Sequence, residues 1–151
     1  MPRPASSREA SIPGERVLLD THVFLWVMNG NPEIRRSRPL TDIEHAAETG
    51  NLLLCSISLF EIAAYARSGR IVSSIPIRDW IAESLETPGL RLVQIDASLA
   101  AEAAALPGEF GGDGADRLII AAARLSHSTL VTADETIAAY AAEGHVRIGR
   151  L

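Results

Sequence analysis

Lysine is missing from this sequence of 151 residues, and all fourteen basic side chains are arginine. Its absence excludes any mechanism that depends on a lysine. Cysteine occurs once, which rules out an intramolecular disulfide, and the place of Cys55 in an apolar run indicates a buried, reduced thiol in a cytoplasmic protein. Long apolar runs are missing too, because Asp20 and Glu61 lie within or beside the longest ones. We therefore expect no membrane span.

An excess of positive charge is also absent, since the net charge is −5. The chain as a whole does not attract nucleic acid, so a bound cation or a local arginine cluster would have to do so. Residues 1–15 are rich in proline, serine and charge and lack the apolar segment of a secretory signal. We expect a disordered tail at 1–15 and a single domain at 16–151.

Short apolar runs alternate with helical patterns along the rest of the chain. This alternation predicts an α/β domain with a mostly parallel sheet. The segment 32–39 is expected to be a connector. Its Arg35, Arg36 and Arg38, together with Arg117, are candidates for phosphate contacts. Strands are predicted at 17–20, 52–55, 90–95 and 129–132, with a candidate last strand at 146–148, and helices at 21–28, 41–49, 58–69, 76–86, 98–106, 116–126 and 134–143.

Four acidic residues follow a strand or open a helix: Asp20, Glu61, Asp116 and Asp134. In a parallel α/β sheet such positions meet at one edge, which is where ligands bind. Carboxylates gathered in one cleft repel one another, and a divalent cation would remove that conflict. Ligands that are all oxygen suit Mg²⁺ or Mn²⁺, and an acid-lined site of this kind typically hydrolyses a bond at phosphorus with metal-activated water.

Each acid taken alone also has a purely structural explanation. Glu61 follows Ser58 with the spacing of a capping box. Thr41 and Glu44, at the start of the helix predicted at 41–49, have the same spacing. Carboxylates are generally favoured where helices start. Zinc is not expected, because no paired ligand spacing links the four histidines, which are His22, His45, His127 and His145.

The sequence resembles the PIN domain in four segments, which occur in the family's order: LLDTHVFLW, SISLFEIAAYARSGRI, GDGADRLIIAAA and LVTADETIAAY. The closest match is the toxin branch, the VapC-type ribonucleases of bacterial toxin–antitoxin pairs. The resemblance spans Arg16 to about Arg147. It implies a parallel sheet of about five strands flanked by helices, and an endoribonuclease that uses Mg²⁺ or Mn²⁺.

The resemblance also implies residue roles. The four acids match the family's catalytic and metal-binding acids in order. One departure concerns the loop before the third acid, where the branch usually has His-x-Asp-Pro. Here Gly111 and Gly114 replace the histidine and the proline, so a looser loop is expected. The residues that match supporting positions are Thr21, Ser58, Asp113, Arg117 and Thr132.

Partners follow from the resemblance as well: an RNA substrate, an antitoxin protein and a second copy of the chain. The helix Phe60–Ala66 could offer a groove to a partner helix, although core packing more commonly explains such a pattern. Three alternatives stay open. A phosphatase would need an aspartate where His22 stands, and a response-regulator receiver would need a lysine. A catalytically inactive, partner-binding PIN-like domain is disfavoured because all four acids are present.

Overall fold

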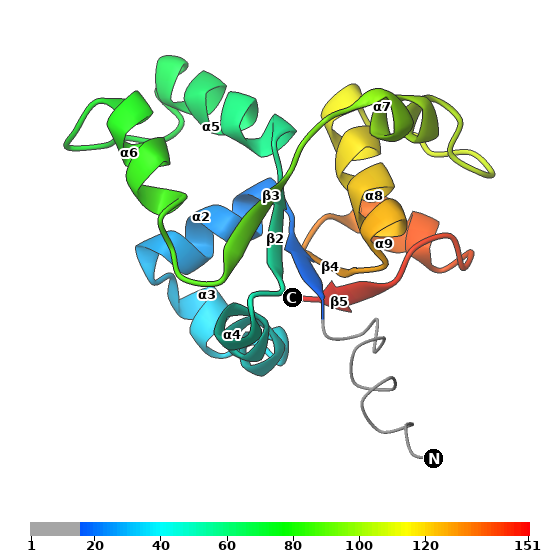
Figure 1. The fold of residues 1–151 in the computed structure, drawn as a ribbon, viewed down its shortest axis with the longest axis horizontal. Helices are drawn as coiled ribbons and strands as arrows, with labels where there is room; N and C mark the ends of the chain where they lie inside the picture. Colours follow the sequence, from blue (N-terminus) through cyan, green and yellow to red (C-terminus); the bar gives the residue numbers. More distant parts are fainter. Residues whose placement is uncertain (1–15) are drawn as a thin grey trace, which may run out of the picture.

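The computed structural model describes residues 16–151, so the expected disordered tail at 1–15 lies outside the described residues. Five strands form one sheet in the order β3-β2-β1-β4-β5 (Figure 1), and every neighbouring pair is parallel. The predicted parallel α/β fold is confirmed. The last strand begins at Ile148 and not at Val146, whose side chain is buried in the core instead. The strands are β1 (Val17–Leu19), β2 (Leu52–Cys55), β3 (Leu90–Val93), β4 (Thr129–Thr132) and β5 (Ile148–Arg150).

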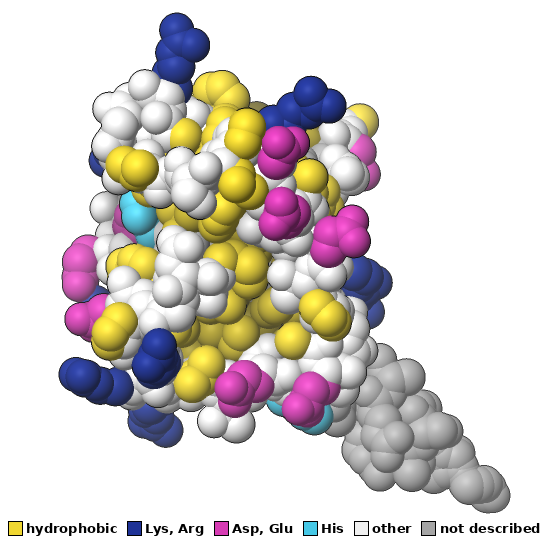
Figure 2. Space-filling view, turned by 90° about the vertical axis from the view of Figure 1, so that its left-hand side faces the viewer, with side chains coloured by type: hydrophobic (Ala, Val, Ile, Leu, Met, Phe, Trp, Pro, Cys, Tyr) yellow, Lys and Arg dark blue, Asp and Glu magenta, His cyan; other side chains and the backbone are white. Residues whose placement is uncertain are grey.

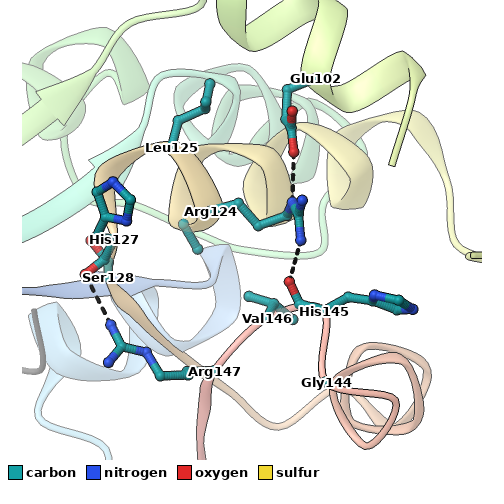
Figure 3. A pocket seen from close by; sticks show the side chains of 10 residues that line it. Glu102, Arg124, Leu125, His127, Ser128, Gly144, His145, Val146 and Arg147 are labelled. Carbon is teal, nitrogen blue, oxygen red and sulfur yellow. Dashed lines mark hydrogen bonds and ion pairs between the residues drawn. The ribbon is translucent and has the colours of Figure 1, made fainter. Parts of the chain in front are cut away.

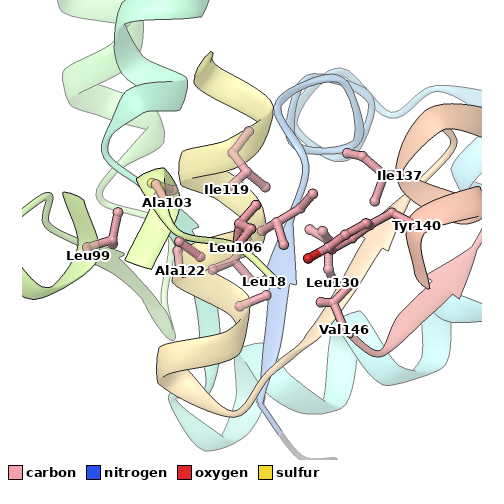
Figure 4. Close-up of a cluster of buried hydrophobic side chains, with 14 of the residues drawn as sticks. Leu18, Leu99, Ala103, Leu106, Ile119, Ala122, Leu130, Ile137, Tyr140 and Val146 are labelled. Atoms are coloured by element: carbon pink, nitrogen blue, oxygen red, sulfur yellow. The ribbon is translucent and has the colours of Figure 1, made fainter. Parts of the chain in front are cut away.

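Helices cover both faces of the sheet, which is why the central strands are continuous apolar runs. Leu18 and Leu130 point into one core, where Ile119 and Ile137 pack beside them (Figure 4). Leu19 and its neighbours on alternate strand positions belong to the other core. The first core is covered by α7 (Ala97–Ala104), α8 (Gly114–Ser126) and α9 (Glu135–Ala141), and the second by α2 (Thr21–Asn29), α3 (Pro32–Arg35), α4 (Pro39–Thr49), α5 (Ile57–Arg67) and α6 (Ile77–Ser84).

Two features of the described residues bear on the class of protein, namely the state of the cysteine and the hydropathy of the helices. Cys55 is fully buried, as predicted, and burial raises the pKa of its thiol. Among residues 16–151, no helix combines the length and the hydropathy that a membrane span requires.

Several predicted helix starts are wrong. The segment 32–39 contains a short helix, α3, whose first turn is capped by the Asn31 side chain. α4 then begins at Pro39, which is favourable at the first helical position, so Thr41 lies inside the helix and the Thr41–Glu44 capping box is wrong. α8 begins at Gly114 and not at Asp116, because the Asp113 side chain caps it.

An apolar hollow lies on the side of the molecule that carries α2 and α6, where hydrophobic side chains gather between charged ones (Figure 2). A groove of about 300 Å³ there runs between α2, α4 and the turn before β3. Val27, Met28 and Leu40 are among the side chains that line it. The α5 segment is different, because Ile62 is fully buried while Phe60 is 68% exposed. Core packing therefore accounts for Ile62.

Two glycines near α4 both adopt positive φ but differ in their surroundings. Gly50 ends α4 with φ +75° and open space around it. Gly89, with φ +83°, lies in the turn before β3, where a Cβ atom would overlap the backbone carbonyl of Ala47. A side chain at position 89 would thus force α4 away from the sheet.

We expect Gly50→Ala to lower the free energy of unfolding by about 1–2 kcal/mol, the cost of placing a Cβ in the left-handed region. Gly89→Ala should lower the free energy of unfolding by clearly more, because the backbone of α4 or of the turn must also move. Urea unfolding of both variants measures the difference. Equal losses would contradict the close approach of the Gly89 turn to α4.

Candidate active site

The acids predicted from the sequence meet in one pocket of about 140 Å³ at the carboxyl edge of the sheet. Asp20 directly follows β1, Glu61 lies on α5, Asp116 lies in the first turn of α8, and Asp134 precedes α9. The structure thus brings together side chains from four distant stretches of sequence. The residues that line the pocket are Asp20, Thr21, His22, Glu61, Tyr65, Asp113, Asp116 and Asp134.

Asp20 is the most deeply buried of these acids, with 8% of its surface exposed. Its Oδ1 accepts a hydrogen bond from the backbone N–H of Thr21 (2.8 Å), so it also caps α2. Its Oδ2 accepts one from the Thr132 hydroxyl (2.6 Å). Burial raises the pKa of Asp20, and the two hydrogen bonds oppose that rise. Capping and pocket formation are therefore served by the same carboxylate.

A chain of buried hydroxyl groups positions Glu61. Thr21 donates its hydroxyl proton to Glu61 Oε1 (2.6 Å), and its oxygen lies 2.7 Å from Ser58 Oγ. Because a hydroxyl has one proton, Ser58 must be the donor to Thr21. The predicted Ser58–Glu61 capping box is therefore wrong: α5 starts at Ile57, and both side chains turn towards Thr21 instead of the helix terminus. Burial raises the pKa of Glu61, and the Thr21 hydrogen bond lowers it in part.

Thr132 links two of the acids. Its hydroxyl donates to Asp20 and accepts a hydrogen bond from the backbone N–H of Asp134 (3.0 Å). Asp134 in turn caps α9, because its Oδ1 accepts from the N–H of Ile137 (3.0 Å). Loss of the Thr132 hydroxyl would loosen both carboxylates at once.

Among the pocket acids, Asp116 has the most strongly raised pKa. Among the described residues, no donor pairs with either of its carboxylate oxygens, although its N–H donates to Asp113 Oδ1 (2.9 Å). Burial, followed by the charges of Asp113 and Asp20, raises its pKa from 3.8 to about 7. A Cβ atom on Gly112 would lie 3.1 Å from Asp116 Oδ2 and would overlap the Phe110 ring. The lack of a side chain at position 112 thus leaves Asp116 open to the pocket.

Arg117 does not face the pocket, and its guanidinium group binds backbone carbonyls. It donates to the carbonyl of Ala103 (2.9 Å) at the end of α7, to that of Ala104 (3.3 Å) and to that of Phe110 (3.4 Å) in the glycine-rich loop. The predicted phosphate contact by Arg117 is therefore not supported, and the residue ties the loop to α7. The arginines of the 32–39 segment do not line the pocket either.

Sequence reasoning missed two residues that do line the pocket, His22 and Tyr65. Their ring centroids are 5.3 Å apart and tilted by 35°. A signal existed for Tyr65, because it follows Glu61 by four residues on α5 and so lies on the same helix face. His22 is in the first turn of α2, two residues after Asp20, and no paired ligand spacing marks it in the sequence.

The donor set fits a hard divalent cation, because the available ligands are carboxylate oxygens. Within residues 16–151, however, no three His, Cys, Asp or Glu side chains are arranged to hold one ion as they stand. Each Asp20 oxygen accepts one hydrogen bond and keeps a second lone pair that could bind a cation. Glu61, Asp116 and Asp134 each keep an oxygen that no described donor contacts. All four acids therefore retain oxygen lone pairs that could turn towards a cation.

A larger hollow of about 550 Å³ lies around the end of α8, away from the acids (Figure 3). There Arg124 forms an ion pair with Glu102 (2.6 Å) and also donates to the carbonyl of His145. Arg147 donates to the carbonyl of His127 (3.0 Å). These arginines connect the end of α8 to the segment before β5. The Glu102 carboxylate in this hollow is already paired with Arg124. The acid-lined pocket is therefore the better candidate site.

Comparison with known proteins agrees with this geometry. The family model of the PIN domain matches residues 17–143. Ribonuclease VapC22 of Mycobacterium tuberculosis is 41% identical over 121 residues, which cover 80% of this chain and 88% of that protein.

Solved structures share the fold. VapBC2 of Rickettsia felis, bound to a DNA fragment from its promoter, matches with a TM-score of 0.65 and 17% identity over 89% of this chain and 97% of that one. DNA-bound VapBC of Salmonella typhimurium matches with a TM-score of 0.61 and 19% identity over 88% and 96%. At such identities the likeness concerns the fold alone.

The raised pKa of Asp116 predicts how the metal-free protein responds to pH. Its folded pKa of about 7 lies above the unfolded value of 3.8, so between these values the folded state binds more protons. The free energy of unfolding must then fall as pH rises through this range. Asp20 and Glu61, whose pKa values are also raised, act in the same direction.

In EDTA we therefore expect a higher melting temperature at about pH 5.5 than at about pH 7.5, and a weaker dependence in Asp116→Asn. Asp96→Asn is the matched control, because Asp96 caps α7 in the same way but lies outside the pocket. A melting temperature that rises with pH by the same amount in all three proteins would contradict the raised pKa values.

Proposed function

The chain belongs to the PIN-domain family, and from this membership and its acidic pocket we propose that it is a divalent-metal-dependent endoribonuclease. The observation that carries the proposal is the convergence of Asp20, Glu61, Asp116 and Asp134 in one pocket. A relative that is 41% identical is named a ribonuclease, which supports RNA as the substrate class. The reaction is hydrolysis of a phosphodiester bond.

Asp20, Glu61, Asp116 and Asp134 would hold Mg²⁺ or Mn²⁺. Asp116 supports this assignment, because burial and neighbouring charges raise its pKa to about 7 without a cation, and a nearby positive charge would favour the carboxylate. When bound, the ion would supply an activated water and neutralise charge on the scissile phosphate. Thr21 and Thr132 keep the Glu61 and Asp20 carboxylates in place, so little reorganisation is needed when substrate arrives.

Single-stranded or loop RNA is the proposed form of the substrate. The chain has a net charge of −5 and its pocket is lined by acids, so it has no electrostatic attraction for a duplex backbone. Binding of unpaired nucleotides depends less on phosphate charge and more on contacts to splayed bases.

We also propose that the chain acts as the toxin of a toxin–antitoxin pair and binds a small antitoxin. The VapBC structures that share its fold support this idea. The groove lined by Val27, Met28 and Leu40 offers an apolar surface for a helix of such a partner. Exposed Phe60 on α5 offers a second apolar contact, so a partner surface on Phe60–Ala66 stays a prediction. Association of two copies of the chain stays a prediction.

Removal of a pocket carboxylate tests the enzymatic proposal. Asp116→Asn and Asp20→Asn should each lower cleavage of labelled single-stranded RNA by roughly 100-fold or more, beyond the 10- to 100-fold typical for an outer-shell partner. EDTA should abolish cleavage, and Mg²⁺ or Mn²⁺ should restore it. Asp96→Asn should cleave normally, since its carboxylate caps α7 outside the pocket. Full activity of Asp116→Asn and Asp20→Asn would contradict a catalytic role for these acids.

Thr132→Val tests whether the Thr132 hydroxyl positions the acids, and it leaves every acidic side chain in the pocket. The variant keeps the side-chain shape but takes a hydrogen-bond donor from buried Asp20, which should cost about 1–3 kcal/mol of folding free energy. Mn²⁺ affinity, measured by titration calorimetry, should fall roughly 10- to 100-fold. Thr129→Val is the control, because it makes the same change at the other end of β4. Unchanged Mn²⁺ affinity in Thr132→Val would contradict a supporting role for this hydroxyl.

A further inference from the structure

We propose that His22, Tyr65 and Arg70 form a stacking subsite at the rim of the acidic pocket, which holds one nucleotide of single-stranded RNA beside the carboxylates. The inference rests on the proposed ribonuclease function and identifies how the protein binds its substrate. His22 and Tyr65 line the pocket itself, and Arg70 extends the group away from it.

The three side chains form a continuous contact between elements that are far apart in sequence. The imidazole of His22, on α2, lies 5.3 Å from the Tyr65 ring on α5, measured between centroids. The guanidinium carbon of Arg70 lies 4.8 Å from the centroid of the same Tyr65 ring. Tyr65 is therefore the common support of a histidine and an arginine.

The backbone after α5 is built to return Arg70 to Tyr65. Gly69 adopts φ +81°, which reverses the chain. The N–H of Arg70 then donates to the carbonyl of Tyr65 (2.8 Å), and that of Ile71 donates to the same carbonyl (3.3 Å). This arrangement of hydrogen bonds is typical of a helix end closed by a left-handed residue. The contact between Arg70 and the tyrosine ring is thus held by the main chain.

The charge of the pocket explains why such a subsite is needed. Five of the eight lining residues are acidic, and His22 is the only basic one. Carboxylates repel the phosphates of RNA, and one bound cation would neutralise charge only at the scissile phosphate, so affinity for the neighbouring nucleotide must come from groups beside the acids. Planar side chains supply it, because base stacking on an aromatic ring is favourable for every base.

The exposure of each residue indicates its part in binding. His22 is exposed and offers a planar face at the pocket, whereas Tyr65 is partly buried and supports it. Arg70 is exposed, and its guanidinium carbon lies over the Tyr65 ring, so its N–H groups are available to a neighbouring phosphate. The subsite thus binds a nucleotide without selecting a base.

The test combines protein variants with an altered substrate. Abasic nucleotides are placed singly at each position of a short RNA oligonucleotide, and the cleavage position is mapped on the intact one. His22→Ala should raise KM for intact RNA about tenfold, within the range that a lost base stack costs, and should change kcat less. One abasic position should raise KM similarly in the wild type but not in His22→Ala. His22→Phe keeps a ring and should restore KM.

Affinity is also measured without catalysis, by fluorescence anisotropy of the same oligonucleotides in the Asp116→Asn background. His45→Ala is the control, since His45 is an exposed histidine on α4. If His22→Ala and His22→Phe both bind intact and abasic RNA as the parent does, the subsite is wrong and the stack only joins α2 to α5. If stacking-dependent binding is found but the wild type cleaves no RNA, the proposed nuclease function fails while the subsite stands.

Discussion

Burial of several carboxylates close to one another is the constraint on which the carboxyl edge of this sheet depends. Burial and mutual charge together raise the pKa of Asp116 to about 7 and shift Asp20 and Glu61 in the same direction. The fold tolerates this cost because small hydroxyl side chains stabilise the charged forms. Thr132 donates to Asp20, and Thr21 donates to Glu61. Asp20 and Glu61 are thus fixed in place while their charge remains unneutralised, which is the condition that a divalent cation would relieve.

The order of the strands is what places these groups together. β1 lies at the centre of the sheet between β2 and β4, and Leu19 is in register with Val131. The next residue on each strand brings Asp20 beside Thr132, so their hydrogen bond follows directly from the register. Both Asp20 and Asp134 also cap the helices that start there. The structural and the proposed catalytic explanations of these acids are therefore not exclusive.

Sequence patterns predicted the sheet well because apolar strands buried on both faces are conspicuous, and the acids that follow them must share an edge. Local helix signals were less reliable. Ser58 and Glu61 have the spacing of a capping box, but Thr21 from another helix competes for both side chains. Arg117 follows an acid in sequence yet points away from the pocket, towards the carbonyls at the end of α7. The contact between His22 and Tyr65 joins two helices and has no signature in either segment alone.

The central claim is that the pocket holds repelling carboxylates whose charge a divalent cation stabilises. The pKa of Asp116, followed by NMR of its side-chain carboxyl carbon during a pH titration, tests this claim most directly. The account predicts titration near pH 7 in EDTA, in agreement with the raised value, and a clear downward shift in saturating Mg²⁺. Titration near the ordinary aspartate value of about 3.9, unchanged by Mg²⁺, would contradict it.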